Sequence, residues 1–173
     1  MFDVPYTDDD AKALLRKHGF KAEDVREEAW VQNNSEEETM NDEEYFPMRY
    51  FALAGDLHMC KWLFAHGAAE DVTKTDEEYG WHPMLEACDG GHLLVCKWLF
   101  EVGAAADITK ANNDGDTPMW IACQEGHLSV CKWLFEVGAA ADISKANGYG
   151  DTPISIACQQ GHLSVCKLSL IHI

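Results

Sequence analysis

Basic residues are scarce in this chain of 173 residues. The sequence has 13 lysine and arginine residues against 30 aspartate and glutamate residues, which gives a formal net charge of −17. Binding to nucleic acid or to an anionic membrane needs clustered basic side chains that pair with phosphates. The composition therefore argues against both, and it favours a partner with a basic surface if charge contributes to recognition. A role in solubility alone explains the charge equally well.

Long apolar runs are also lacking. A membrane-spanning helix needs about 20 consecutive apolar residues, and no stretch of the sequence approaches that length. The opening residues, MFDVPYTDDD, have neither the basic start nor the apolar core of a secretory signal. Seven cysteines without such a signal predict free thiols in a reducing compartment. We expect a cytosolic location, with the nucleus as the alternative.

The sequence contains no motif of a common enzyme class. It has no phosphate-binding glycine loop, no dinucleotide-binding glycine pattern, no HExxH zinc motif and no kinase signature. No histidine stands with serine or cysteine in a recognisable hydrolase motif. We therefore expect no catalytic residue and no cofactor.

The chain does contain an internal repeat. Four cysteines, spaced 36, 35 and 35 residues apart, share similar sequence words such as GHLLVCKWLF and GHLSVCKWLF. Prolines and glycines recur at the same intervals, and three residue types in one register predict four tandem units. The cysteines are Cys60, Cys96, Cys131 and Cys166. The prolines are Pro47, Pro83, Pro118 and Pro153.

Each unit has the pattern of two short helices and a connector. Thr117 is placed to cap a helix that starts at Pro118, runs to about residue 125 and stops at Gly126. A second helix is predicted from about Leu128 to Val137, before Gly138. The polar stretch AAADISKANGYG then predicts an extended, hairpin-like connector. One such unit cannot bury its own apolar face, so we expect the units to stack.

The repeated word resembles the ankyrin repeat. It combines DGDTP, AC, GHLSVCKWLFEV and GAAADI in the order of that family's pattern, over residues 45–173. The resemblance implies an all-α solenoid of four helix-turn-helix units with hairpin-like connectors, behind a partly helical acidic N-terminal segment. The approximate bounds of the units are 45–80, 81–115, 116–150 and an incomplete 151–173.

The sequence departs from the ankyrin pattern in three ways. The family's usual histidine after Thr-Pro-x is replaced in every unit, by Arg49, Leu85, Trp120 and Ser155. Phe46 replaces the capping threonine of the first unit, as expected of an N-terminal capping unit, and His82 replaces that of the second. After GHLSVCK the chain reads LSLIHI where WLFEVG is expected. We interpret this change as a truncated or spliced end rather than an evolved cap.

Residues 1–44 differ in composition from the repeats. TDDDAKALLRKHG predicts a helix that Thr7 caps, with three aspartates at its positive end. A second helix is predicted in KAEDVREEAW, ending near Trp30, and the acidic stretch 33–44 is predicted to be a flexible linker. The helical segment 1–32 either docks on the first unit or extends freely.

The recurring cysteines admit structural, metal and redox interpretations. Zinc sites are usually marked by close pairs such as CxxC, whereas the two cysteines within each of the last three units are 8 residues apart. Packed helix axes stand roughly 8–10 Å apart, too far for thiolates to converge on one zinc or for stacked equivalents to form disulfides. A redox cysteine needs an exposed thiol beside basic groups. We interpret the cysteines as core residues and expect no metal site.

Recurring histidines and tryptophans are also expected to be structural. The resemblance implies that the histidines of the GH pairs brace the turn between helices through backbone groups. The tryptophans of the KWLF words share one position of the second helix, and we expect them to stack as a ladder between units. The histidines are His92, His127 and His162. The tryptophans are Trp62, Trp98 and Trp133.

The resemblance also implies a function. Connector tips and first helices line a concave recognition face in ankyrin repeats, so we expect a non-catalytic scaffold that binds a partner protein there. Aromatic side chains at such positions often anchor interfaces. One alternative is a regulatory or adaptor fragment of a larger enzyme or channel, and a weaker one is a cysteine-based metal or redox sensor. The candidate contacts are Tyr79, Trp81, Glu86, Asp114, Asp116, Trp120, Tyr149, Asp151 and Ser155.

Overall fold

The structure, a computed structural model, describes residues 6–20 and 46–171. The second N-terminal helix predicted near residues 21–30 and the predicted linker 33–44 lie outside the described residues.

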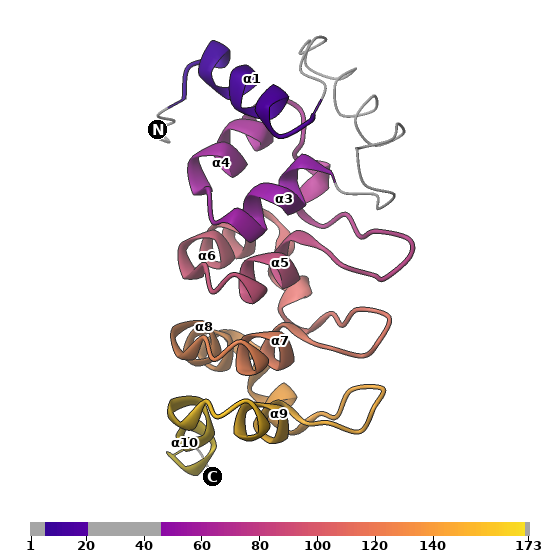
Figure 1. The fold of residues 1–173 in the computed structure, drawn as a ribbon, viewed down its shortest axis with the longest axis vertical. Helices are drawn as coiled ribbons and strands as arrows, with labels where there is room; N and C mark the ends of the chain where they lie inside the picture. The colour runs from indigo at the N-terminus through magenta and orange to yellow at the C-terminus, as the bar shows by residue number, and fades with distance from the viewer. Residues whose placement is uncertain (1–5, 21–45, 172–173) are drawn as a thin grey trace.

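Four helix pairs are stacked in chain order along the long axis of the molecule (Figure 1). The second helices lie on one side of the stack, and the loops between units project from the other side as hairpins beside the first helices. The described residues contain helices, turns and loops but no strand. The predicted all-α array of four units is therefore confirmed. The pairs are α3 (Pro47–Ala54) with α4 (Leu57–Ala65), α5 (Pro83–Asp89) with α6 (Leu93–Val102), α7 (Pro118–Gln124) with α8 (Leu128–Leu134), and α9 (Pro153–Gln159) with α10 (Leu163–Ile171).

Local sequence explains where the first helices begin. Each starts at a proline, whose fixed φ suits the first helical turn. The Thr117 hydroxyl caps α7 by accepting from the Trp120 amide at 3.2 Å. Thr152 caps α9 in the same way and forms a capping box with Ser155. The predicted capping role of Thr117 is confirmed.

Histidines of the GH pairs join successive units. His92 Nε2 donates to the Leu53 carbonyl oxygen at 2.9 Å, and His127 Nε2 donates to the Asp89 carbonyl oxygen at 2.8 Å. Each acceptor ends the first helix of the preceding unit. These histidines bond backbone groups as expected, but the bonds link two units rather than the two helices of one unit.

Glycines at the turns between the paired helices leave space for the histidine rings that join the units. Gly55 adopts a left-handed φ of 74°, and a Cβ built on it would collide with the His92 ring. Gly126 has a φ of 78° and the same relation to His162. A larger residue at these turns would displace the histidine of the next unit.

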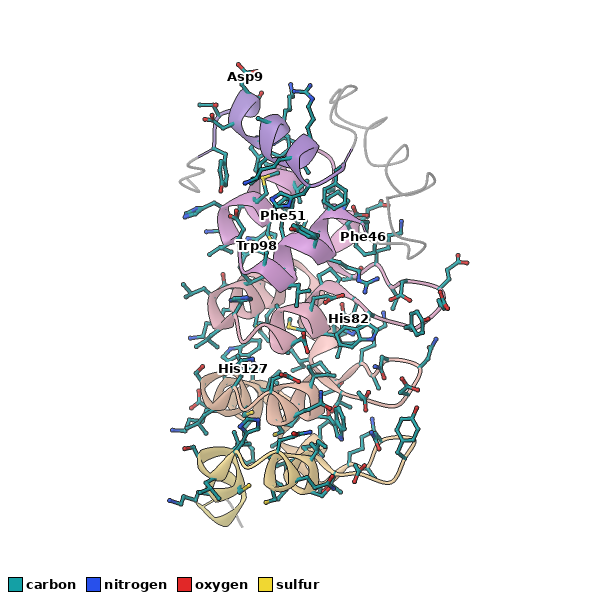
Figure 2. All side chains as sticks on the ribbon, in the orientation of Figure 1. Asp9, Phe46, Phe51, His82, Trp98 and His127 are labelled. Atoms are coloured by element: carbon teal, nitrogen blue, oxygen red, sulfur yellow. The ribbon has the colours of Figure 1, made fainter. Side chains whose placement is uncertain are left out.

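The tryptophans of the second helices pack differently from the expected ladder. Trp98, labelled in Figure 2, meets Phe64 of the preceding unit edge to face, and the ring centroids are 5.7 Å apart. Trp133 meets Phe100 in the same way at 5.8 Å. The buried contact between units therefore pairs tryptophan with phenylalanine, because the side chain two residues further along the KWLF word faces the next unit.

The connectors are only partly extended. Ala104–Thr109 and Ala140–Ser144 form 3₁₀ helices, η2 and η4, and Glu70–Val72 forms a shorter one, η1. The second helix of the third unit is α-helical to Leu134, and the backbone leaves the helical conformation at Gly138, whose φ is 123°. The prediction of an extended start to the connector was wrong, since the alanines favour helical backbone.

The N-terminal helix docks on the first unit. In α1 (Asp8–Lys17), Thr7 accepts from the Asp10 amide, as predicted, and Leu15 is fully buried. The Tyr6 hydroxyl donates to Asp56 at 2.9 Å, and the Trp62 indole donates to Asp8 at 3.2 Å. Of the two arrangements left open by the sequence, the docked one is present, with α1 above α4 (Figure 1).

An aspartate is buried at the equivalent position of three repeats, shortly after the second helix. These residues are Asp71, Asp107 and Asp142. Burial raises the pKa of each, and it raises the pKa of Asp71 to about 6 despite the opposing effect of Lys74. The pKa of an aspartate carboxyl is near 4 in the unfolded chain, so a higher pKa in the folded state stabilises the fold below about pH 4. That stabilising contribution is lost as the pH rises through 6. The array should therefore be less stable at neutral than at mildly acidic pH.

Replacement of Asp71 by asparagine tests this burial effect. Asp71→Asn removes the ionisable group, so we expect the free energy of unfolding near pH 7.5 to rise by roughly 1–3 kcal/mol and its change between pH 5 and 7.5 to shrink. Urea denaturation followed by circular dichroism at both pH values measures this. Asp114→Asn, at an exposed position, is the control; equal pH dependence in wild type and Asp71→Asn would contradict the account.

Candidate interaction surface

The hairpins are joined in register from unit to unit. The Asn113 amide donates to the Tyr79 carbonyl oxygen at 2.9 Å, and the Gly148 amide donates to the Asp114 carbonyl oxygen at 2.7 Å. The Asn113 side chain adds a bond to the Glu78 carbonyl oxygen at 2.9 Å. The three tips, residues 77–79, 113–114 and 148–150, thus form one continuous row along the molecule (Figure 1), which we call the tip edge.

An Asp or Asn side chain shapes each hairpin. Asp76 accepts from the amides of residues 79, 80 and 81. Asn112 Oδ1 accepts from the Asp114 and Asp116 amides at 3.0 and 2.8 Å, and Asn147 Oδ1 accepts from the residue 149 and 151 amides at 3.0 Å each. Because these acceptors are buried, the tips are held by the body of the array rather than by solvent.

Three of the sequence-predicted contacts lie on the tip edge: Tyr79, Asp114 and Tyr149. Tyr79 is 47% exposed, Tyr149 is 76% exposed, and Asp114 is also exposed. The Tyr149 hydroxyl donates to Asp114 Oδ1 at 3.1 Å, and this hydrogen bond raises the pKa of the tyrosine. The structure therefore brings an acid from one hairpin against an aromatic side chain from the next.

Two acidic residues of the tip edge were missed by the sequence reasoning. Glu77 and Glu78 are both exposed and precede Tyr79. Their position in the connector could have identified them as surface residues, because no neighbouring segment is available to bury two charged side chains at the tip of a hairpin.

Three further predicted contacts are half-buried beside the hairpins: Trp81, Asp151 and Ser155. The Ser155 hydroxyl donates to the Thr152 carbonyl oxygen and accepts from its amide, both at 2.8 Å. Asp151 accepts from Gln159 at 3.3 Å. These side chains border the tip edge, although Ser155 also caps the start of α9 and Asp151 bonds its last residue.

The expectation that Glu86, Asp116 and Trp120 are accessible was wrong. Glu86 is buried in an ion pair, and Asp116 accepts from the buried amides of Asn112 and Asn147 at 3.2 and 2.8 Å. Trp120 is 7% exposed, and its indole donates to the Asp151 carbonyl oxygen at 3.0 Å. Each side chain is occupied in joining one unit to the next, so none is offered to a partner.

The described geometry agrees with a comparison against protein families. The family model described as ankyrin repeats (3 copies) matches residues 9–112 and 102–172. The chain belongs to the ankyrin-repeat family. Ankyrin repeats are generally protein–protein interaction modules and are typically non-catalytic. No match was found among curated proteins.

The first match begins at residue 9, within α1, and the two matches together extend to residue 172. Among the described helices, none has the length and apolar character needed to cross a membrane.

Arg49, which replaces the family's histidine, joins the first two ankyrin units. Its guanidinium lies 2.6 Å from Glu86 and 3.0 Å from Asp76, and all three side chains are buried. Burial lowers the pKa of His82 to about 4, so this histidine is neutral at physiological pH. Its Nε2 donates to the Lys110 carbonyl oxygen at 3.2 Å.

The two cysteines of each of the last three ankyrin units face one another more closely than expected. Sγ–Sγ distances are 3.9 Å for Cys88 and Cys96, 3.7 Å for Cys123 and Cys131, and 2.7 Å in the fourth unit. The expectation that helix spacing keeps the sulfurs apart was wrong, since the side chains of adjacent helices point toward each other. The described residues include no group of three or more His, Cys, Asp or Glu placed to hold a metal ion.

Removal of Arg49 should destabilise the array strongly. Arg49→Ala leaves two buried carboxylates without their cation, and we expect the free energy of unfolding to fall by about 3–5 kcal/mol. Lys97→Ala, an exposed change on α6, should cost under about 0.5 kcal/mol. Urea denaturation measures both, and equal losses in the two variants would rule out a structural role for the buried ion network.

Proposed function

We propose that this ankyrin-repeat chain is a non-catalytic binding protein that holds a partner carrying a lysine- or arginine-rich surface along its tip edge. The observation that carries the proposal is the chemistry of that edge. Glu77, Glu78 and Asp114 supply exposed carboxylates, and Tyr79 and Tyr149 supply large exposed aromatic rings. Such a combination suits a basic side chain, which can pair with an acid and pack on a ring.

The distribution of basic residues supports this orientation. Exposed Lys97, Lys132 and Lys167 lie on the second helices, on the side of the array opposite to the hairpins (Figure 1). Near the base of the hairpins, the Lys110 ammonium donates to Thr75 at 2.9 Å, and the Lys74 ammonium lies over the Phe46 ring. The tip edge itself carries three exposed carboxylates and no basic residue, and such a surface attracts basic partners at low salt.

A comparison of two units within the chain adds support. Residues 91–125 and 126–160 differ at only seven of 35 aligned positions. Four of the seven differences lie in the hairpin tip and the first helix. They are Asn113/Gly148, Asp114/Tyr149, Met119/Ile154 and Trp120/Ser155. The framework is therefore repeated almost unchanged, while the side that we assign to recognition is varied.

We propose a cytosolic or nuclear location on the basis of the burial of the cysteines. Five of the seven cysteines are buried as thiols, which suits a cytosolic or nuclear protein kept in a reducing medium.

Variants that remove acidic charge from the tip edge test its role in partner binding. Peptides are first selected on the wild-type array from a random library, and we expect the selected peptides to be rich in lysine and arginine. Glu77→Gln with Glu78→Gln should then weaken binding of such a peptide by about 5- to 30-fold and reduce its salt dependence. Fluorescence anisotropy at two salt concentrations measures both effects.

The control changes the same charge on the opposite side. Glu101→Gln with Glu136→Gln, on and after the second helices, should leave the affinity within about twofold of wild type. Selection of peptides without basic residues, or equal losses in the two double variants, would contradict the proposal.

A further inference from the structure

The residue that shapes the turn differs among the three hairpins. It is Asp76 in the first, Asn112 in the second and Asn147 in the third, and each side chain accepts from backbone amides of its own turn. Asn147 is followed by Gly148, and this is the single asparagine–glycine pair in the sequence. The three turns therefore share a hydrogen-bonding pattern but differ in chemical stability.

An asparagine followed by glycine can lose its side-chain amide without an enzyme. The backbone nitrogen of the glycine attacks Cγ of the asparagine, and glycine has no side chain to hinder the approach. A new C–N bond closes a succinimide ring, the bond from Cγ to the side-chain nitrogen breaks, and ammonia leaves with the proton of the glycine nitrogen. Water from the solvent then opens the ring to aspartate or isoaspartate, so that one water is consumed for each ammonia released.

Hydrogen bonds hold both reacting groups in the third hairpin, which leads into α9 (Figure 1). The Gly148 amide donates to the Asp114 carbonyl oxygen at 2.7 Å, so the attacking nitrogen is engaged by the preceding hairpin. Asn147 Oδ1 accepts from two amides of the turn, and Asn147 Nδ2 donates to Asp116 Oδ1 at 2.8 Å. The attack needs a released nitrogen and a turned side chain, and hence a locally open hairpin.

We propose that Asn147 is a spontaneous modification site, which loses its side-chain amide when the third hairpin opens and then keeps that hairpin from closing again. This inference does not depend on the proposed partner. It rests on the Asn147–Gly148 pair and on the hydrogen bonds that tie both residues to the preceding unit.

Loss of the amide would break the link between the second and third hairpins. In the folded chain the Asn147 amide donates to the Asp116 carboxylate, and both side chains are buried. Aspartate in place of Asn147 would put a second buried carboxylate where the hydrogen-bond donor was, and the two negative charges would repel each other. Isoaspartate would also lengthen the backbone of the turn. Either product would release the third tip from the tip edge.

Mass spectrometry of the full chain tests the reaction with an internal control. The 173-residue chain is kept in mildly alkaline buffer, either folded or in guanidinium chloride, and is then digested with trypsin. Cleavage at lysine gives residues 111–132, which contain Asn112, and residues 146–167, which contain Asn147. Fragmentation locates the conversion of amide to acid, and a sample digested without incubation corrects for deamidation during digestion.

In the denatured chain we expect Asn147 to deamidate at least about tenfold faster than Asn112, because the side chain of Asn113 hinders the attack and Gly148 has none. In the folded chain we expect the rate at Asn147 to fall by at least about tenfold, because only the open hairpin reacts. Equal rates at Asn112 and Asn147 in denaturant, or equal rates at Asn147 in the folded and denatured chains, would overturn the proposal.

The Asn147→Asp variant reproduces one product and tests its effect on the hairpin. We expect the Gly148 amide to exchange with solvent deuterium at least about tenfold faster than in wild type, while the amides of α5 keep their protection. Gln160→Glu, the same chemical change at an exposed residue, is the matched control and should leave exchange at Gly148 unchanged.

Two results of the exchange experiment would contradict the proposal. The first is a Gly148 amide that is as well protected in Asn147→Asp as in wild type. The second is a loss of protection in α5 as well, because the whole array rather than one hairpin would then have opened.

Discussion

The packing of each helix pair on the next is the interaction on which the rest of this structure depends. The paired helices are 7 to 10 residues long, too short to be stable alone in water. Their apolar faces are buried only between units, where Trp98 meets Phe64 and His92 bonds the Leu53 carbonyl oxygen. Buried polar links such as Arg49 with Glu86 then fix how one unit sits on its neighbour.

This stacking also sets the chemistry at the surface. Since each unit is held on the last, successive hairpins lie close enough for the Gly148 amide to bond Asp114, and the tips become one edge instead of separate loops. Stacking likewise removes thiols from solvent, because Cys88 and Cys123 are fully buried where the first helix of the next unit packs on their own helix. The surface that we assign to partner binding therefore depends on the stacking of the units.

Sequence periodicity predicted those features that belong to a single unit. The register of prolines, glycines and cysteines gave four helix pairs, and Thr7 and Thr117 were identified as caps because capping involves only neighbouring residues. Contacts between units were not predictable in the same way. Arg49, Leu85 and Trp120 share one position of the repeat and all three are buried. Their contacts differ, because Arg49 forms an ion pair with Glu86 while the Trp120 indole donates to the Asp151 carbonyl oxygen of the following hairpin. A position in the repeat therefore does not reveal which contact its side chain makes with the neighbouring unit.

Stacking of the units holds the hairpin tips as one ordered edge, and amide hydrogen exchange measures this order at individual residues. The decisive amides are those of Asn113 and Gly148, which donate to the tip of the preceding unit. We expect both amides to exchange slowly, with opening free energies close to those of helix amides in the same units. Exchange at the rate of an unstructured loop, while the helices stay protected, would contradict it.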